Sequence, residues 1–84
     1  MDTTSEILHA LRSIIICLIE DKNQLVIDAI PQPNRHTLIE VRATKRDAGA
    51  IIGKDGRNAR ALRTLVGSIG LKAGRVFTLD ITPL

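Results

Sequence analysis

Hydrophobic and polar residues alternate with two different periods along the first half of the chain. Apolar residues recur at helical spacing between Thr3 and about Glu20, which predicts an amphipathic helix. A period of two follows over residues 24–30 and again over Thr37–Ala43, which predicts two strands. The segment Pro31–Asn34 between them is rich in proline and predicts a turn. We therefore expect the order helix, strand, turn, strand.

The second half of the chain returns to a helical period. We expect a short helix over Asp47–Ile52, with Asp47 as its N-cap, and a second helix over Arg57–Ile69. A last strand is expected over Val76–Ile81. The end of the second helix is expected to be loosened by three glycines, Gly67, Gly70 and Gly74.

These elements predict an α+β fold in a single domain over residues 1–84. The N-terminal helix and strand fall within residues 3–32, and the remaining elements form a core over residues 36–82. A chain of this length buries roughly 60% of its unfolded surface, which is enough for a modest core. Four residues of the second strand should share one of its faces, Thr37, Ile39, Val41 and Ala43, with Leu38, Glu40 and Arg42 on the other.

Two glycines three positions apart, Gly53 and Gly56, separate the two helices of the second half. Glycine permits a tight turn and lets another backbone approach closely. The residues after Gly56 begin a helix, and the first N–H groups of a helix lack partners and attract anions. Lys54 within the loop and Arg57 after it bring positive charge to the same place. The segment therefore predicts a phosphate-binding site.

The run Ile51–Arg57, followed by Ala59, Ala61 and Arg63–Val66, resembles the signature of KH domains. In these domains a G-x-x-G loop between two helices clamps about four nucleotides of a single strand. The resemblance covers roughly positions 41–81 and is closest to the small stand-alone bacterial KH proteins of the KhpA type. It implies a type II-like KH domain, with a three-stranded sheet packed against three helices in the order α-β-β-α-α-β. Asp55 departs from the neutral or basic residue often found there, which leaves open whether its charge weakens binding.

Composition and charge agree with a nucleic-acid ligand. The chain is 44% hydrophobic but has one Phe and no Trp or Tyr, so its core must be aliphatic and base stacking on aromatic platforms is excluded. Residues 1–40 hold three basic and six acidic residues, whereas residues 41–84 hold nine basic and three acidic residues. The positive excess surrounds the glycines, as expected for a site that binds a polyanion. The alternative is that the basic residues only solvate helix faces.

The candidate RNA-binding residues are the loop, its neighbours and part of the second strand: Ile51, Ile52, Gly53, Lys54, Asp55, Gly56, Arg57, Arg60, Val41 and Arg42. Glycines and cations would hold phosphates, while Ile51, Ile52 and Val41, together with Ile39, would form an aliphatic floor for bases. The alternative for these aliphatic residues is packing in the core. For Arg42 and Lys45 the alternative is a solvated surface charge.

Other chemistry finds little support in the sequence. The segment Gly49–Lys54 lacks the spacing and the Ser or Thr of a nucleotide-binding P-loop. His9 and His36 lie on different elements without metal-ligand spacing, so we expect no metal, no cofactor, no small-molecule substrate and no enzyme activity. Cys17 is the single cysteine, which indicates a reducing compartment. No apolar run approaches the ~20 residues of a membrane span and no signal peptide is evident, so we expect a cytoplasmic protein without membrane contact.

Two functions stay open. In the first, the chain binds single-stranded RNA as a post-transcriptional regulator or RNA chaperone. In the second, it is a protein-interaction module that forms a homodimer, or a heterodimer with another KH-domain protein, and RNA contact is secondary. The glycine loop favours the first, and the apolar Ile16 and Ile19 beside the polar face of the first helix favour the second. Single-stranded DNA is an alternative ligand, because phosphate clamping does not read the 2′-hydroxyl group.

Overall fold

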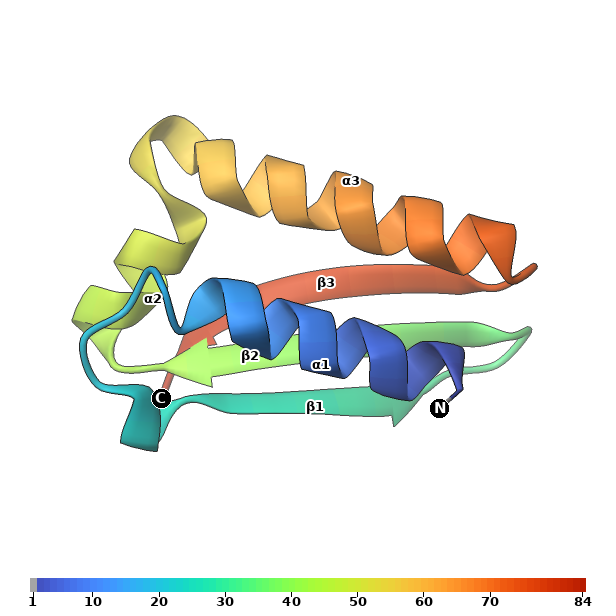
Figure 1. The fold of residues 1–84 in the computed structure, drawn as a ribbon, viewed down its shortest axis with the longest axis horizontal. Coiled ribbons are helices and arrows are strands. Elements are labelled where there is room, and N and C mark those ends of the chain that lie inside the picture. Colours follow the sequence, from blue (N-terminus) through green and yellow to red (C-terminus); the bar gives the residue numbers. More distant parts are fainter. Residues whose placement is uncertain (1) are drawn as a thin grey trace.

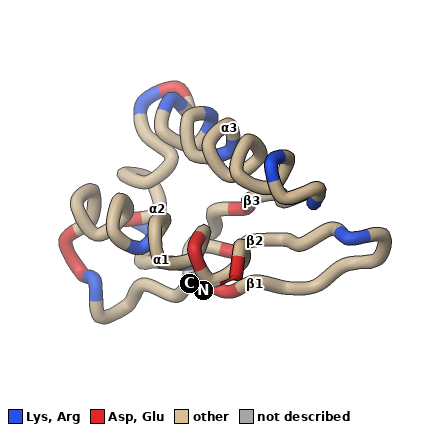
Figure 2. Tube along the Cα trace, turned by 45° about the vertical axis from the view of Figure 1, so that its right-hand side comes forward, with Lys and Arg blue, Asp and Glu red and all other residues tan. Residues whose placement is uncertain are grey.

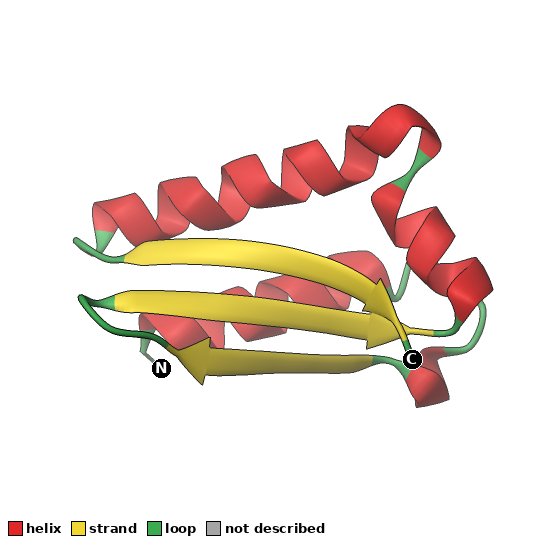
Figure 3. Cartoon of the chain, turned by 180° about the vertical axis from the view of Figure 1, so that it is seen from behind, coloured by secondary structure: helices red, strands yellow, loops and turns green. Residues whose placement is uncertain are grey.

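The computed structural model describes residues 2–84 as three helices on one face of a three-stranded sheet (Figure 1). Figure 3 views the same chain from behind and shows the opposite face of the sheet without a covering helix. The expected α+β class and order of elements are confirmed. In chain order the elements are α1 (Thr3–Ile15), a short 3₁₀ turn η1 (Lys22–Gln24), β1 (Val26–Pro31), β2 (His36–Ala43), α2 (Lys45–Ile52), a second 3₁₀ turn η2 (Lys54–Gly56), α3 (Arg57–Lys72) and β3 (Val76–Pro83).

The sheet has the order β1-β2-β3, with β1 antiparallel to β2 and β2 parallel to β3. The register places Val41 between Ile27 of β1 and Ile81 of β3. Parallel neighbours cannot be joined by a tight hairpin, so the chain must cross from the end of β2 back to the start of β3. Helices α2 and α3 make that crossing. Their junction lies at the end of the sheet where β2 and β3 finish (Figure 1).

The core between the helices and the sheet is aliphatic except for Phe77, which is buried at 5% exposure. The four residues predicted to share one face of β2, Thr37, Ile39, Val41 and Ala43, are all buried, so this face turns to the core. The helices contribute the other large members of this core: Ile7, Leu11, Ile15, Ile51, Leu62 and Val66. Among residues 2–84 no helix combines the length and the apolar content needed to cross a bilayer.

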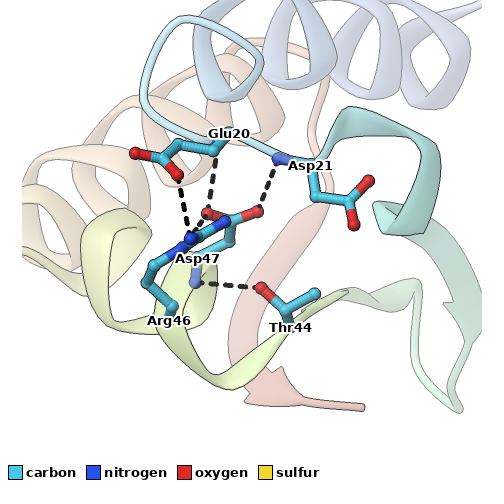
Figure 4. A network of polar contacts seen from close by, with 5 residues as sticks. All are labelled: Glu20, Asp21, Thr44, Arg46 and Asp47. Atoms are coloured by element: carbon cyan, nitrogen blue, oxygen red, sulfur yellow. Dashed lines mark hydrogen bonds and ion pairs between the residues drawn. The ribbon is translucent and has the colours of Figure 1, made fainter.

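The N-cap predicted for α2 is wrong, because Thr44 holds that position. The Thr44 Oγ1 atom accepts a hydrogen bond from the Asp47 backbone N–H at 3.2 Å. The Asp47 carboxylate, only 1% exposed, instead accepts the backbone N–H groups of Glu20 at 3.1 Å and Asp21 at 2.9 Å (Figure 4). These two donors hold the pKa of Asp47 below its ordinary value, so it stays ionised near neutral pH.

This network explains why α1 is shorter than predicted. The helix ends at Ile15 rather than near Glu20, and the chain then turns so that the amides of residues 20 and 21 reach the carboxylate on α2. Arg46 pairs with the Glu20 side chain at 2.9 Å across the same junction. The link from the α1–β1 connection to the first turn of α2 is thus formed by residues 26 or more positions apart.

The glycines of α3 do not loosen it, contrary to expectation. The helix passes through Gly67 and Gly70 and ends at Lys72, before Gly74 adopts φ +70°. Gly70 is required by packing, because a Cβ atom there would overlap the Phe77 ring and lie 3.0 Å from the Arg75 carbonyl oxygen. A Cβ atom at Gly67 would meet nothing within 4 Å. Packing therefore requires a glycine at position 70 but not at position 67.

We predict opposite effects of alanine at these two helical glycines. Gly70→Ala should lower the free energy of unfolding by about 1–3 kcal/mol, because the added methyl group overpacks the contact with Phe77. Gly67→Ala should leave stability unchanged or raise it by up to about 1 kcal/mol, since alanine is the better helix former and has room. Urea denaturation of both variants measures the difference. Equal effects would contradict the assigned role of Gly70.

Candidate nucleic-acid interface

The segment Gly53–Gly56, called here the glycine loop, turns the chain sharply between α2 and α3. Three of its residues have positive φ: Gly53 at +78°, Asp55 at +57° and Gly56 at +74°. Only glycine adopts such conformations freely, although aspartate tolerates the left-handed helical region better than most residues. The predicted need for two glycines at this spacing is thus explained by backbone conformation.

The carbonyl groups of the loop are directed inward by hydrogen bonds. The Gly53 carbonyl oxygen accepts the Gly56 N–H at 3.0 Å, and the Lys54 carbonyl oxygen accepts the Arg57 N–H. The N–H and C=O of a trans peptide point in opposite directions, so the N–H groups of Lys54 and Asp55 point away from the loop. Neither amide takes part in a hydrogen bond with the rest of residues 2–84. Two adjacent donors are therefore presented to an anion from outside.

Exposed cations surround these two amides. Lys54, Arg57 and Arg60 are all exposed, and α3 begins at the loop without a side-chain cap. Arg60 also stabilises the loop, because its Nη1 atom donates to the Asp55 carbonyl oxygen at 2.7 Å. The ion pairs within residues 2–84 involve Arg42 and Arg46 and none of the loop residues. Figure 2 shows basic positions on both sides of an acidic one where α2 is joined to α3.

The apolar candidates beside the loop lie mostly below the surface. Ile51, Val41 and Ile39 are each 0% exposed and pack in the core, as the alternative interpretation had it. Ile52, the last residue of α2, is half-buried and borders the loop directly. Of the four aliphatic residues expected to form a floor for bases, only Ile52 is therefore partly exposed beside the loop.

Arg42 and Lys45 do not join the loop in the same way. Arg42 alternates with buried Val41 along β2, so it lies on the uncovered face of the sheet, where it pairs with Glu40 at 3.7 Å. That face also carries a row of three acidic residues in register across the strands: Asp28, Glu40 and Asp80. Lys45 is exposed at the first position of α2, one helix length from the loop. The uncovered face thus disfavours a polyanion, and the glycine loop lies on the opposite, helical side.

Asn58 is a residue of this site that sequence analysis missed. Its side-chain Nδ2 atom donates to the Ala50 carbonyl oxygen at 3.1 Å, which connects the first turn of α3 to the last turn of α2. A polar residue near a helix start is common, so its position gave no signal of this contact. Arg63, on α3, donates from Nε to the Leu79 carbonyl oxygen at 3.1 Å.

The described part of the chain offers little to other chemistry. Across residues 2–84 there is no group of three or more His, Cys, Asp or Glu side chains arranged to hold a metal ion. The exposed Cys17 donates its thiol to the Ser13 carbonyl oxygen at 3.4 Å.

Comparison with known proteins gives a consistent result. The model of the family described as KhpA/KhpB, KH domain, matches residues 8–81. A protein named RNA-binding protein KhpA from Borreliella burgdorferi is 35% identical over 68 residues, which cover 81% of this chain and 82% of the relative. Proteins of the same name from Aquifex aeolicus and Mycobacterium tuberculosis are 38% identical over 64 residues (76% and 80%) and 32% identical over 74 residues (88% and 91%). No solved structure matches the chain significantly.

Proposed function

The chain belongs to the KhpA/KhpB family of KH domains, and from this membership we propose that it binds single-stranded RNA through the glycine loop. The observation that carries the proposal is the pair of outward N–H groups of Lys54 and Asp55, surrounded by exposed cations. The relatives named above are RNA-binding proteins by name, which supports RNA as the ligand class.

In the proposed mechanism, backbone contacts hold the strand and confer little sequence preference. A phosphate accepts hydrogen bonds from the N–H groups of Lys54 and Asp55. The side chains of Lys54, Arg57 and Arg60 neutralise the charge of this phosphate and of the adjacent phosphates along the strand. The adjacent base lies against Ile52. With three or four phosphates neutralised, the slope of log K against log salt concentration is about −2 to −3. One such module binds weakly, because the chain lacks exposed aromatic residues for stacking.

Weak, sequence-tolerant binding of single strands suits an RNA chaperone or post-transcriptional regulator in the cytoplasm, which we propose as the cellular role. No cofactor, metal or small-molecule substrate enters this mechanism. Because a phosphate clamp does not contact the 2′-hydroxyl group, single-stranded DNA should compete for the site. Preference for RNA would have to arise from contacts of the sugar with residues next to the loop.

We predict that removing the loop cation weakens binding through its charge. Lys54→Met keeps the length of the side chain but removes the ammonium group, so the salt slope should become shallower by about 0.7. At about 0.1 M salt the Kd for a labelled single-stranded RNA should rise roughly fivefold, the effect of one close charge pair in water. Fluorescence anisotropy at several salt concentrations measures both quantities.

The matched control changes the neighbouring charge in the opposite direction. Asp55→Asn removes a negative charge, and asparagine also tolerates the left-handed conformation that residue 55 adopts at φ +57°. Its Kd should fall below that of the native chain at low salt. If both variants bind like the native chain, the loop is not the RNA site, and binding must be assigned to another surface.

A second candidate function, association of two chains, is favoured by an apolar groove between α1 and α3. The groove has a volume of about 80 Å³ and is lined only by apolar residues: Ile7, Ala10, Leu11, Ile14, Leu62, Leu65, Val66 and Ile69. Ile14, Leu65 and Ile69 are 42%, 51% and 39% exposed, so the groove is open to solvent. Ile19, which together with Ile16 suggested a partner surface in the sequence, packs against the core.

We propose that this groove joins two copies, or one copy and another KH-domain protein. Pairing would compensate for a weak single clamp, because two linked clamps bind one strand with a raised effective concentration.

We predict that Leu65→Lys abolishes self-association. A lysine among the residues that line the groove must be desolvated in the complex, which opposes pairing. Light scattering should give twice the chain mass of 9.2 kDa for the native protein and 9.2 kDa for the variant. Leu71→Lys is the control, because Leu71 lies on the same helix, is 78% exposed and does not line the groove. A native chain that stays monomeric at high concentration would contradict homodimerisation.

A further inference from the structure

The carbonyl oxygen of Ala50, near the end of α2, has an unusual hydrogen-bond partner. In a continuing helix this oxygen would accept the N–H four residues later, which belongs to Lys54. The chain leaves the helix at Gly53, and the Nδ2 atom of Asn58 donates to the Ala50 oxygen instead, at 3.1 Å. The side-chain amide therefore occupies the acceptor that would otherwise attract the Lys54 N–H.

We infer that Asn58 is a positioning residue that keeps the Lys54 amide free for phosphate. This inference rests on the proposed function of the glycine loop. Because Asn58 satisfies the Ala50 carbonyl oxygen, extension of α2 by one residue would gain no hydrogen bond. The Lys54 N–H therefore stays available at the site. It also joins the last turn of α2 to the first turn of α3, the two helices between which the loop turns.

Contact between Asn58 and Gly53 supports the same role. A Cβ atom at residue 53 would lie 2.8 Å from both Cγ and Nδ2 of Asn58 and 3.1 Å from its Cβ. The asparagine side chain thus packs directly on the first glycine of the loop, and the lack of a side chain at Gly53 makes this packing possible. Glycine at this position therefore serves two needs, a φ of +78° and room for Asn58.

Asn58 acts on the phosphate only through the backbone. Its side chain is uncharged, half-buried and directed to the carbonyl group of α2. Arg60 supports the other end of the loop through the Asp55 carbonyl oxygen, but it is also an exposed cation, so its two contributions cannot be separated by simple truncation. Asn58 offers the cleaner test of a preformed loop.

The test compares the native chain with Asn58→Ala and with Ser68→Ala, a control at an exposed position of the same helix. Alanine has a higher helix propensity than asparagine or serine, so weaker binding by either variant cannot be attributed to a less stable α3. Anisotropy titrations with a short unstructured RNA are run at several salt concentrations, under conditions where urea titration shows each protein fully folded. We expect Asn58→Ala to raise the Kd about fivefold, the effect of one net hydrogen bond, and Ser68→Ala to match the native chain.

The dynamics of the loop amides separate positioning from direct contact. Asn58→Ala should keep the native salt slope, because the substitution removes no charge and the number of neutralised phosphates is unchanged. The NMR order parameters of the Lys54 and Asp55 amides should fall from about 0.85 toward about 0.6, which reports a loosened loop.

Three results would overturn the inference. Native affinity in Asn58→Ala would show that the loop does not depend on this side chain, while leaving the proposed RNA site intact. Weaker binding by that variant with unchanged order parameters of the Lys54 and Asp55 amides would assign Asn58 a direct contact with RNA. Failure of the native chain to bind RNA would remove the proposed function, and the inference with it. If Asn58→Ala does not fold, Asn58→Leu, which fills the space but donates no hydrogen bond, is read by the same criteria.

Discussion

Parallel pairing of β2 with β3 is the constraint on which the site depends. It obliges the chain to cross the sheet between the two strands, and helices α2 and α3 make the crossing on one face. Helices α2 and α3 run in different directions (Figure 1), so the chain turns sharply at their junction. The glycine loop makes this turn with three positive φ angles, and the inward carbonyl groups that hold it leave two amides pointing outward. The proposed phosphate site thus follows from the turn between the two crossing helices.

The molecule is electrically polar in the direction that this site requires. Exposed cations surround the loop on the helical side, whereas Asp28, Glu40 and Asp80 lie in register across the uncovered face of the sheet. A polyanion is therefore attracted toward one end of the helical layer and repelled from the opposite face. The placement of the charged residues therefore matters more for the attraction of a polyanion than the small net charge of +3.

Periodicity and turn chemistry were sufficient to predict the order of elements and the residues that share each face of β2, because side chains repeat with a different period in helices and in strands. The errors arose where distant residues meet. Asp47 was read as a helix cap, since its bonds to the amides of residues 20 and 21 depend on tertiary structure. Gly70 was expected to loosen the end of its helix, because its contact with Phe77 is not visible in local sequence. The same reason hid Asn58, whose partner lies eight residues away across the loop.

The most direct test of the central claim is an NMR titration of the isotopically labelled chain with a short single-stranded RNA. The account predicts that the backbone amides of Lys54 and Asp55 show the largest chemical-shift changes, with smaller changes at the start of α3. The uncovered face of the sheet, including Asp28 and Asp80, should stay unchanged. Large changes on that face, or in the groove between α1 and α3, with the loop amides unaffected, would contradict it.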